Sequence, residues 1–195
     1  MSEVELPNPE ELEEIKGKAF TRHVALTTAI FAVILAVSSL GGGVAMKEML
    51  LSQQQASDQW AFYQAKNMRE HFYRGQKERL ELDLLEKETL KPEVKERYAE
   101  LLKKMEVEEA RYNVEKLEIA KEAKHLEHER DKYRAKDPYF EYAEVLLQIA
   151  IVMSSIAILA HSRLMFGFSL IPAALGALLA ANGFLMIVPL PFFGP

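Results

Sequence analysis

The chain has 195 residues, of which 49 % are hydrophobic and 27 % are charged, and its formal net charge is -5 at pH 7. It contains no cysteine, which excludes disulfides, thiol nucleophiles and thiolate metal sites. Most of its 24 Lys and Arg residues lie between Met46 and Lys136 among an excess of acids, so no basic stripe points to nucleic acid. Because charge is almost absent from residues 24–45 and 145–195, the sequence predicts a membrane protein with one extramembrane segment.

Residues 1–19 are predicted to form an amphipathic segment, and they carry no secretory signal pattern. Asn8 suits a helix cap, Pro9 suits the first helical position, and Glu11 lies three residues after the cap. We expect a short helix to begin here and to lie along the membrane surface.

Residues 20–45 are predicted to hold the first transmembrane helix and a glycine joint. The span runs from Phe20 to Leu40 and is long enough to cross a hydrocarbon core of about 30 Å. Three glycines follow at residues 41–43, and each destabilises a helix by roughly 1 kcal/mol. We expect these glycines to let the next helix leave the membrane at an angle to the span.

Residues 46–136 are predicted to form a long extramembrane antiparallel helical hairpin. Glu, Lys, Leu, Ala, Gln and Arg dominate this stretch, and these residues lose least on entering a helix. A proline stops a helix but fits a helix start. We therefore expect the first arm to end near Thr89 and the second to begin at Pro92, with the turn near residues 90–92.

The second arm carries a seven-residue repeat that is typical of a coiled-coil seam. Its members are Tyr98, Met105, Tyr112, Ile119, Leu126 and Tyr133, and they are supplemented by Leu101, Leu102, Ala123 and Ala135. The positions three residues further along are Leu101, Glu108, Glu115, Glu122 and Glu129. Because this second position is mostly charged, the apolar stripe is narrow and the arm needs a partner.

Residues at equal distances from Lys91 are expected to face each other across the hairpin. The facing pairs include Ala56 with Leu126, Tyr63 with Ile119, Glu70 with Tyr112, and Lys77 with Met105. The base and the tip of the hairpin are then apolar, and its middle is polar. Either neighbouring copies of the protein pack against the middle and complete its core, or the hairpin is partly frayed. Trp60, Phe62 and Tyr63 are interpreted as the core of the base, although aromatic residues there also suit a membrane anchor or a ligand-binding cluster.

Residues 137–195 are predicted to hold the second and third transmembrane helices and a short tail. Asp137 and Pro138 start the second span, which runs from Tyr139 to Ala160. The third span runs from about Leu164 or Gly167 to Val188, and the tail that follows carries no charge.

Polar residues recur along one face of the second span. They lie at steps of three, four and seven residues and are Glu141, Glu144, Gln148 and Ser155. One hypothesis is that they line a pore formed by several copies. The alternative is that the two glutamates lie at the membrane interface, while Gln148 and Ser155 form hydrogen bonds across a helix contact.

The third span carries small residues that favour close helix packing. They are Ala173, Gly176, Ala177, Ala180 and Ala181. Asn182 is the one strongly polar residue of this span, and we interpret it as an interhelical hydrogen-bonding group rather than a ligand or selectivity residue.

A possible metal-binding spacing occurs in the second arm, where His125 and His128 lie among Glu122 and Glu129. Such a site needs a second copy of the motif on a facing helix, and the first arm supplies only Asp58 at that level. We therefore interpret these residues as a solvated helix face and expect no metal and no cofactor. No phosphate-binding, dinucleotide-binding, nucleophile-elbow or zinc-protease motif occurs, so the sequence does not predict an enzyme.

Basic residues near the first span indicate how the protein is oriented in the membrane. Lys16, Lys18 and Arg22 precede it, and only Lys47 closely follows it. The positive-inside rule then places the amino terminus in the cytoplasm and the hairpin in the periplasm. The basic residues at 130–136, beside the second span, favour the opposite orientation, so the sidedness stays open.

The segments FTRHVALTTAIFAVILAVSSLGG and LSQQQASDQWAFYQAK, with the three-span layout, resemble the domain-of-unknown-function family numbered 4337, a family of uncharacterised bacterial membrane proteins. The resemblance extends over nearly the whole chain. It implies a bacterial inner-membrane protein and brings no catalytic or binding residue with it. It also gives no role to residues 53–55, the Gln-Gln-Gln of the second segment.

Taken together, these patterns predict an all-α membrane protein with a coiled-coil hairpin between its first and second transmembrane helices. The leading functional hypothesis is a homo-oligomeric inner-membrane scaffold that has no catalytic activity and binds an unknown protein at the outer end of the hairpin. The alternative is a pore or ion-channel subunit whose second span lines the path.

Overall fold

The structure, a computed structural model, describes residues 9–87 and 90–188. The described chain is all α-helical, as predicted, and its long helices pack antiparallel. They are α1 (Pro9–Glu86), α2 (Pro92–Arg134), α3 (Asp137–Leu159) and α4 (Arg163–Leu185). The chain divides into two compact units, one of Met1–Glu48 with Lys132–Pro195 and one of Met49–Asp131.

Three helical stretches are long and apolar enough to cross a membrane, namely Gly17–Glu86, Pro92–Leu159 and Arg163–Leu185. The second stretch counts α2 and α3 together across their short junction. The first two stretches have 70 and 68 residues, which far exceeds the roughly 20 residues that a membrane crossing needs. They are therefore not simple transmembrane helices, because only one part of each is apolar.

Helix α1 corrects two expectations about the amino-terminal part of the chain. It begins at Pro9, as predicted, but continues without interruption through Phe20, so the structure has no separate short helix. Asn8, the predicted helix cap, lies outside the described residues. Residues 41–43 are also helical, so the expected glycine joint does not break the helix. Packing explains this, because tertiary contacts at Gly41 and Gly42 outweigh the low helix propensity of glycine.

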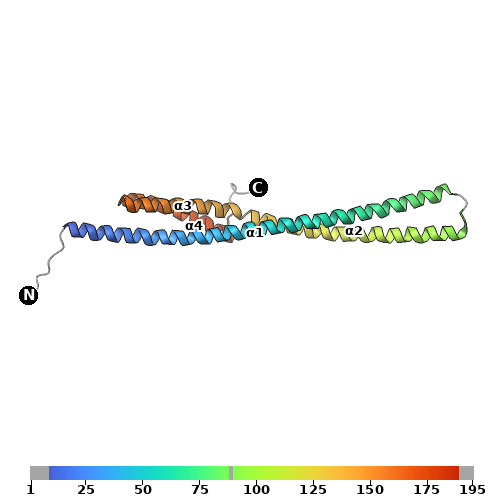
Figure 1. The fold of residues 1–195 in the computed structure, drawn as a ribbon, viewed down its shortest axis with the longest axis horizontal. Helices are drawn as coiled ribbons and strands as arrows, with labels where there is room; N and C mark the ends of the chain where they lie inside the picture. The colour runs from blue at the N-terminus through green and yellow to red at the C-terminus, as the bar shows by residue number, and fades with distance from the viewer. Residues whose placement is uncertain (1–8, 88–89, 189–195) are drawn as a thin grey trace, which may run out of the picture. The chain divides into compact units, whose positions relative to one another are not determined.

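In the first unit, α3 and α4 lie side by side and are joined through Ala160–Ser162 (Figure 1). Small residues on both helices allow a close approach. Gly176 is so close to α3 that an added Cβ would lie 2.9 Å from Leu147 Cγ and 3.0 Å from the Ala143 carbonyl oxygen. The first part of α1 packs against the pair. The resulting core consists of Phe31, Leu147, Ala150 and Ala173, with Ile34, Leu35 and Ile151 around it.

In the second unit, the rest of α1 pairs with α2. Helix α2 begins at Pro92, as the proline predicted, whereas α1 ends at Glu86 and therefore short of the expected limit. Thr89 lies outside the described residues. At the far end of α2, the helix stops at Arg134 and α3 begins at Asp137, in agreement with the expected start of the last segment.

Candidate functional site

The middle of the hairpin contains an ionic cluster of five side chains, Glu70, Arg74, Lys77, Glu109 and Lys116. Glu70 is only 1 % exposed and accepts from Arg74 Nη2 at 2.5 Å, while its other oxygen pairs with the Lys116 ammonium. Arg74 Nε also donates to Glu109 Oε1 at 2.9 Å, and Lys77 Nζ donates to Glu109 Oε2 at 2.6 Å. The polar middle predicted from the sequence is therefore a connected set of ion pairs between α1 and α2.

A pair of tyrosines lies beside the ionic cluster. The rings of Tyr73 and Tyr112 stack with centroids 5.7 Å apart and planes 13° from parallel. Tyr112 is buried, and the Lys66 ammonium of α1 lies 5.3 Å from its ring centroid. Cations near an aromatic face are attracted by the ring quadrupole, so this tyrosine pair adds to the attraction between the arms.

The ionic cluster shifts the protonation of its members. Hydrogen bonds from Lys77 and then Arg74 lower the pKa of Glu109 below its ordinary value of 4.5. The Glu109 carboxylate in turn raises the pKa of Lys77. Outside the cluster, a hydrogen bond from Lys66, 2.5 Å away, lowers the pKa of Glu115. Folding therefore favours the ionised form of Glu109 and Glu115, which is the form that makes these ion pairs.

Acid is therefore expected to destabilise the hairpin. A carboxylate whose pKa is lowered by folding contributes stability above its unfolded pKa, and this stability is lost as the pH falls through the folded value. For Glu109 the loss begins as the pH drops below about its ordinary value of 4.5. Thermal unfolding followed by circular dichroism should show a falling midpoint in this range, with a shallower fall in Glu109→Gln. An equally steep fall in that variant would contradict the assignment.

The base of the hairpin is apolar, as expected. Ala56 and Ala123 are both buried, and the ring of Tyr63 packs edge to face on Trp60 with centroids 5.4 Å apart. The Trp60 indole Nε1 donates to Glu127 Oε1 at 2.9 Å. These contacts favour the core interpretation of Trp60 and Tyr63 over an exposed anchor. Phe62 is 59 % exposed, so it does not belong to the expected core.

The Gln-Gln-Gln segment contributes one contact between the two arms. Gln53 Oε1 accepts from Arg130 Nη1 at 2.8 Å. Gln54 bonds within its own helix, where Nε2 donates to Asp58 Oδ1 at 3.1 Å. Gln53 therefore helps to hold the base together.

The seam of α2 differs from the expected one in its second position. The seven-residue repeat from Tyr98 to Tyr133 is at least partly buried throughout, with Tyr112 the most buried of its members. The second position lies four residues after the repeat rather than three, since Ala123 is 0 % exposed and Glu122 is exposed. Its members are Leu102, Glu109, Lys116, Ala123 and Arg130. Leu102 and Ala123, four residues after Tyr98 and Ile119, were the signal for this register.

Each arm also carries a second apolar stripe, which faces away from the seam and which the sequence analysis missed. The outer stripe of α1 repeats at steps of four and three residues from Ala61 to Gly75 and then skips to Leu82, seven residues further along. It consists of Ala61, Ala65, Met68, Phe72, Gly75 and Leu82, all exposed. The outer stripe of α2 consists of Val107, Ala110, Val114 and Leu117, also all exposed. Ion pairs from Lys66 to Glu115 and from Lys77 to Glu109 place both stripes at the level of the ionic cluster. At this level the hairpin is charged inside and apolar outside.

The four polar residues of α3 that were candidates for a pore lining lie outside the contact between α3 and α4. Glu141, Gln148 and Ser155 are exposed, and Glu144 is half-buried. The Ser155 hydroxyl donates to the Ile151 carbonyl of its own helix at 2.9 Å, so Ser155 does not form the expected hydrogen bond across a helix contact. The buried face of α3 instead consists of Ala143, Leu147, Ala150, Ser154 and Ala157.

The small residues of α4 divide between its two faces. Ala173, Gly176 and Ala180 are buried, Ala177 is half-buried and Ala181 is exposed. Ser169 and Gly183 complete the buried face at the same spacing. The sequence analysis missed Ser169, whose hydroxyl accepts from Ser154 Oγ at 2.9 Å and so joins α3 to α4.

Asn182 serves the end of its own helix rather than an interhelical contact. Its Nδ2 donates to the Val188 carbonyl at 2.8 Å, and its Oδ1 accepts from the Val188 amide at 3.0 Å. These two bonds fold the chain back where Met186, in the left-handed region with φ 49°, closes α4. Asn182 is therefore a capping residue.

His125 and His128 are both exposed on α2. Across residues 9–87 and 90–188, no group of three or more His, Asp or Glu side chains has the arrangement of a metal site.

These features define a class, the all-α proteins with long antiparallel helices of which three are apolar enough for membrane crossing. The chain belongs to the family described as Domain of unknown function (DUF4337), which it matches over residues 20–186. The match covers the hairpin and all of α3 and α4. No curated protein and no solved structure matches the chain, so none lends it an activity, ligand or partner.

Proposed function

We propose that this protein is a homo-oligomeric scaffold of the bacterial inner membrane, without catalytic activity. The apolar parts of α1, α3 and α4 cross the bilayer, and the hairpin packs against hairpins of other copies outside it. Following the positive-inside rule, the amino terminus lies in the cytoplasm and the hairpin in the periplasm. The turn near Lys91 is then free to reach a protein partner.

The membrane placement is supported by the large apolar side chains that the first unit exposes. They include Leu26, Ile30, Val33, Val152, Leu164 and Leu178, each more than half exposed. Soluble proteins rarely expose contiguous apolar surface of this extent. Hydrocarbon covers such a surface, and the helices satisfy their own backbone hydrogen bonds there.

The oligomer is supported by the two outer stripes of the hairpin, which carry the proposal. The hairpin holds most of the chain's charge, so lipid is a poor cover for it. Met68, Phe72 and Leu82 are nevertheless 73 %, 60 % and 60 % exposed. Burying one such side chain stabilises a contact by about 1.5–3 kcal/mol.

The spacing of the outer stripes supports another helix as their partner. Steps of four and three residues match the knobs-into-holes packing of coiled coils. Ala61, Ala65 and Gly75 leave room between the larger side chains, so a second helix can approach closely. A neighbouring hairpin supplies such a helix from the same sequence and at the same distance from the membrane.

The exposed polar face of α3 favours a second candidate, a pore subunit in which that face lines the path. Gln148 and Ser155 would then surround the symmetry axis of the oligomer, and liposomes that contain the protein would conduct ions. In a scaffold, lipid or packed side chains fill the centre of the oligomer, and the liposomes do not conduct ions.

The substitution Phe72→Glu tests the proposed oligomer. The whole chain in mild detergent should form particles of several copies, and Phe72→Glu should reduce the number of copies, because it places charge in the outer stripe of α1. Light scattering coupled to size exclusion measures the protein mass of each particle. Gln55→Glu is the matched control, because Gln55 is exposed on the same helix outside the stripe.

A cysteine at position 68 adds an independent readout, since the chain has no cysteine of its own. Met68→Cys should form disulfide-linked dimers on mild oxidation in membranes, and Gln55→Cys should form few. Single-copy particles of the unaltered protein, or equal crosslinking at both positions, would overturn the proposed assembly.

A further inference from the structure

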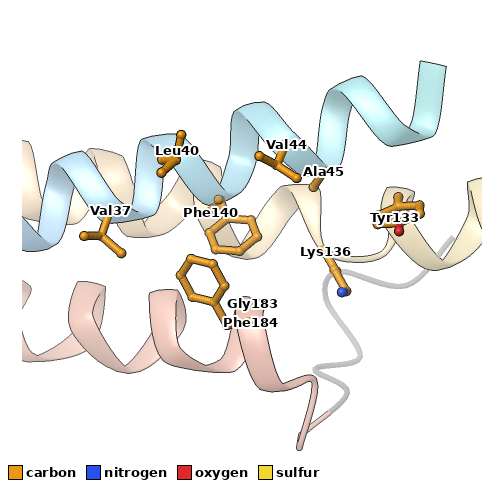
Figure 2. Close-up of a pocket in the computed structure, with 10 residues that line it drawn as sticks. Val37, Leu40, Val44, Ala45, Tyr133, Lys136, Phe140, Gly183 and Phe184 are labelled. Carbon is orange, nitrogen blue, oxygen red and sulfur yellow. The ribbon is translucent and has the colours of Figure 1, made fainter. Parts of the chain in front are cut away.

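A cavity of about 320 Å³ lies in the first unit, among α1, the start of α3 and the end of α4 (Figure 2). Its walls are almost entirely apolar. They are formed by Val37, Leu40, Gly41, Val44, Ala45, Phe140, Gly183 and Phe184, and two further residues, Tyr133 and Lys136, complete the lining. Val37 and Lys136 lie toward opposite ends of the cavity (Figure 2).

The cavity is shaped by two aromatic rings and two glycines. Phe140 and Phe184 pack edge to face with their centroids 4.9 Å apart. A Cβ at Gly41 would lie 2.6 Å from Phe184 and 2.7 Å from Phe140, and one at Gly183 would lie 3.0 Å from Phe140. The glycines therefore let the rings sit close to the backbone, beside the open volume.

The one charged group of the lining is the Lys136 ammonium. Its Nζ lies 5.5 Å from the centre of the Tyr133 ring, and none of the carboxylates in the described chain forms an ion pair with it. Asp137 follows in the sequence but does not line the cavity. Lys136 lies where the charged helix α2 gives way to the apolar helix α3. This is the level at which lipid headgroups meet a membrane protein.

We propose that this cavity binds an anionic phospholipid. One acyl chain lies along the apolar wall between Val37 and Phe184, and the headgroup phosphate pairs with the Lys136 ammonium. The volume is near the lower limit of small-molecule sites, about 300–1,000 Å³, which suits one chain rather than a whole lipid. The inference rests on the membrane placement proposed above and is independent of the oligomer.

The test measures which lipid stays with the protein. The full chain is reconstituted in nanodiscs of equal parts phosphatidylcholine and phosphatidylglycerol and transferred to detergent, and the retained lipid is identified by mass spectrometry. We expect phosphatidylglycerol to be enriched over phosphatidylcholine. Lys136→Gln should lower that enrichment about fivefold, as expected for the loss of one lysine near an anionic headgroup. Arg134→Gln, which removes an exposed charge outside the cavity, should leave it unchanged.

A second pair of variants tests the apolar wall. Val44→Trp fills the cavity and should reduce retention of both lipids, whereas Val33→Trp, on the same helix and outside the cavity, should not. Equal retention in Lys136→Gln and the unaltered protein, or equal retention of the two lipids, would overturn the proposal. A chain that fails to enter nanodiscs would instead overturn the membrane placement itself.

Discussion

Leucine at Gly41 is expected to lower the thermal unfolding midpoint of the protein, whereas leucine at Gly43 is expected to keep or raise it. Both changes replace a helical glycine by a better helix former, which stabilises by up to about 1 kcal/mol. Only Gly41 faces other side chains, since an added Cβ there would lie 2.6 Å from Phe184 and 2.7 Å from Phe140. At Gly43 nothing lies within 4 Å.

The cost at Gly41 arises from overpacking, because a side chain there pushes α1 away from both rings. Such changes typically destabilise by about 1–3 kcal/mol. The measurement is thermal unfolding of both variants in the same detergent, followed by circular dichroism. Equal midpoints would show that the close approach of α1 at Gly41 is not needed for stability. A loss at Gly43 that matches the loss at Gly41 would assign both effects to the membrane environment instead.

Removing the charge of Glu70 is expected to be the most damaging single change in the hairpin. Glu70→Gln leaves the Lys116 ammonium, only 14 % exposed, without its carboxylate. Breaking a fully buried ion pair typically costs about 3–5 kcal/mol. A loss of about 2 kcal/mol is expected here, because water reaches the edges of the cluster. Thermal or urea unfolding of the whole chain measures the difference.

A double substitution separates two effects on stability, namely the cost of leaving one buried charge without its partner and the net contribution of the ion pair itself. In Glu70→Leu with Lys116→Leu both charges are gone, so the hairpin should recover most of the stability lost in Glu70→Gln. Glu100→Gln is the matched control, because its pair with Arg97 is exposed at 65 % and 74 % and contributes little. Similar losses for Glu100→Gln and Glu70→Gln would contradict the special role of the buried cluster.

Much of the fold could be predicted because single residues decide helix limits. Pro92 begins α2 and Asp137 begins α3, as their sequence context indicated. The glycines at 41–43 misled the prediction, because low helix propensity is a local signal and the rings that pack there come from distant parts of the chain.

The candidate surfaces were harder to predict than the helices. The second position of the α2 seam was predicted one residue too early. The repeat through Tyr112 does not by itself show whether Glu115, three residues later, or Lys116, four residues later, occupies that position. The outer stripe of α1 escaped notice because it consists largely of Ala, Gly and single large residues among charges, and the exposure of Met68 and Phe72 identifies it. The cavity forms where α1, α3 and α4 meet, and no local pattern of residues in the sequence indicates such a meeting.

The small-residue contact between α3 and α4 has a consequence for the order in which the molecule is built. The two helices are neighbours in the chain, so bringing them together closes only a short loop and costs little entropy. The Ser154–Ser169 hydrogen bond and the Gly176 contact are then available at once. Helix α1 reaches the same core through Phe31 and must wait until the whole of α2 has been synthesised. We therefore expect the carboxyl-terminal pair to form early, as a template on which the first-made helix docks last.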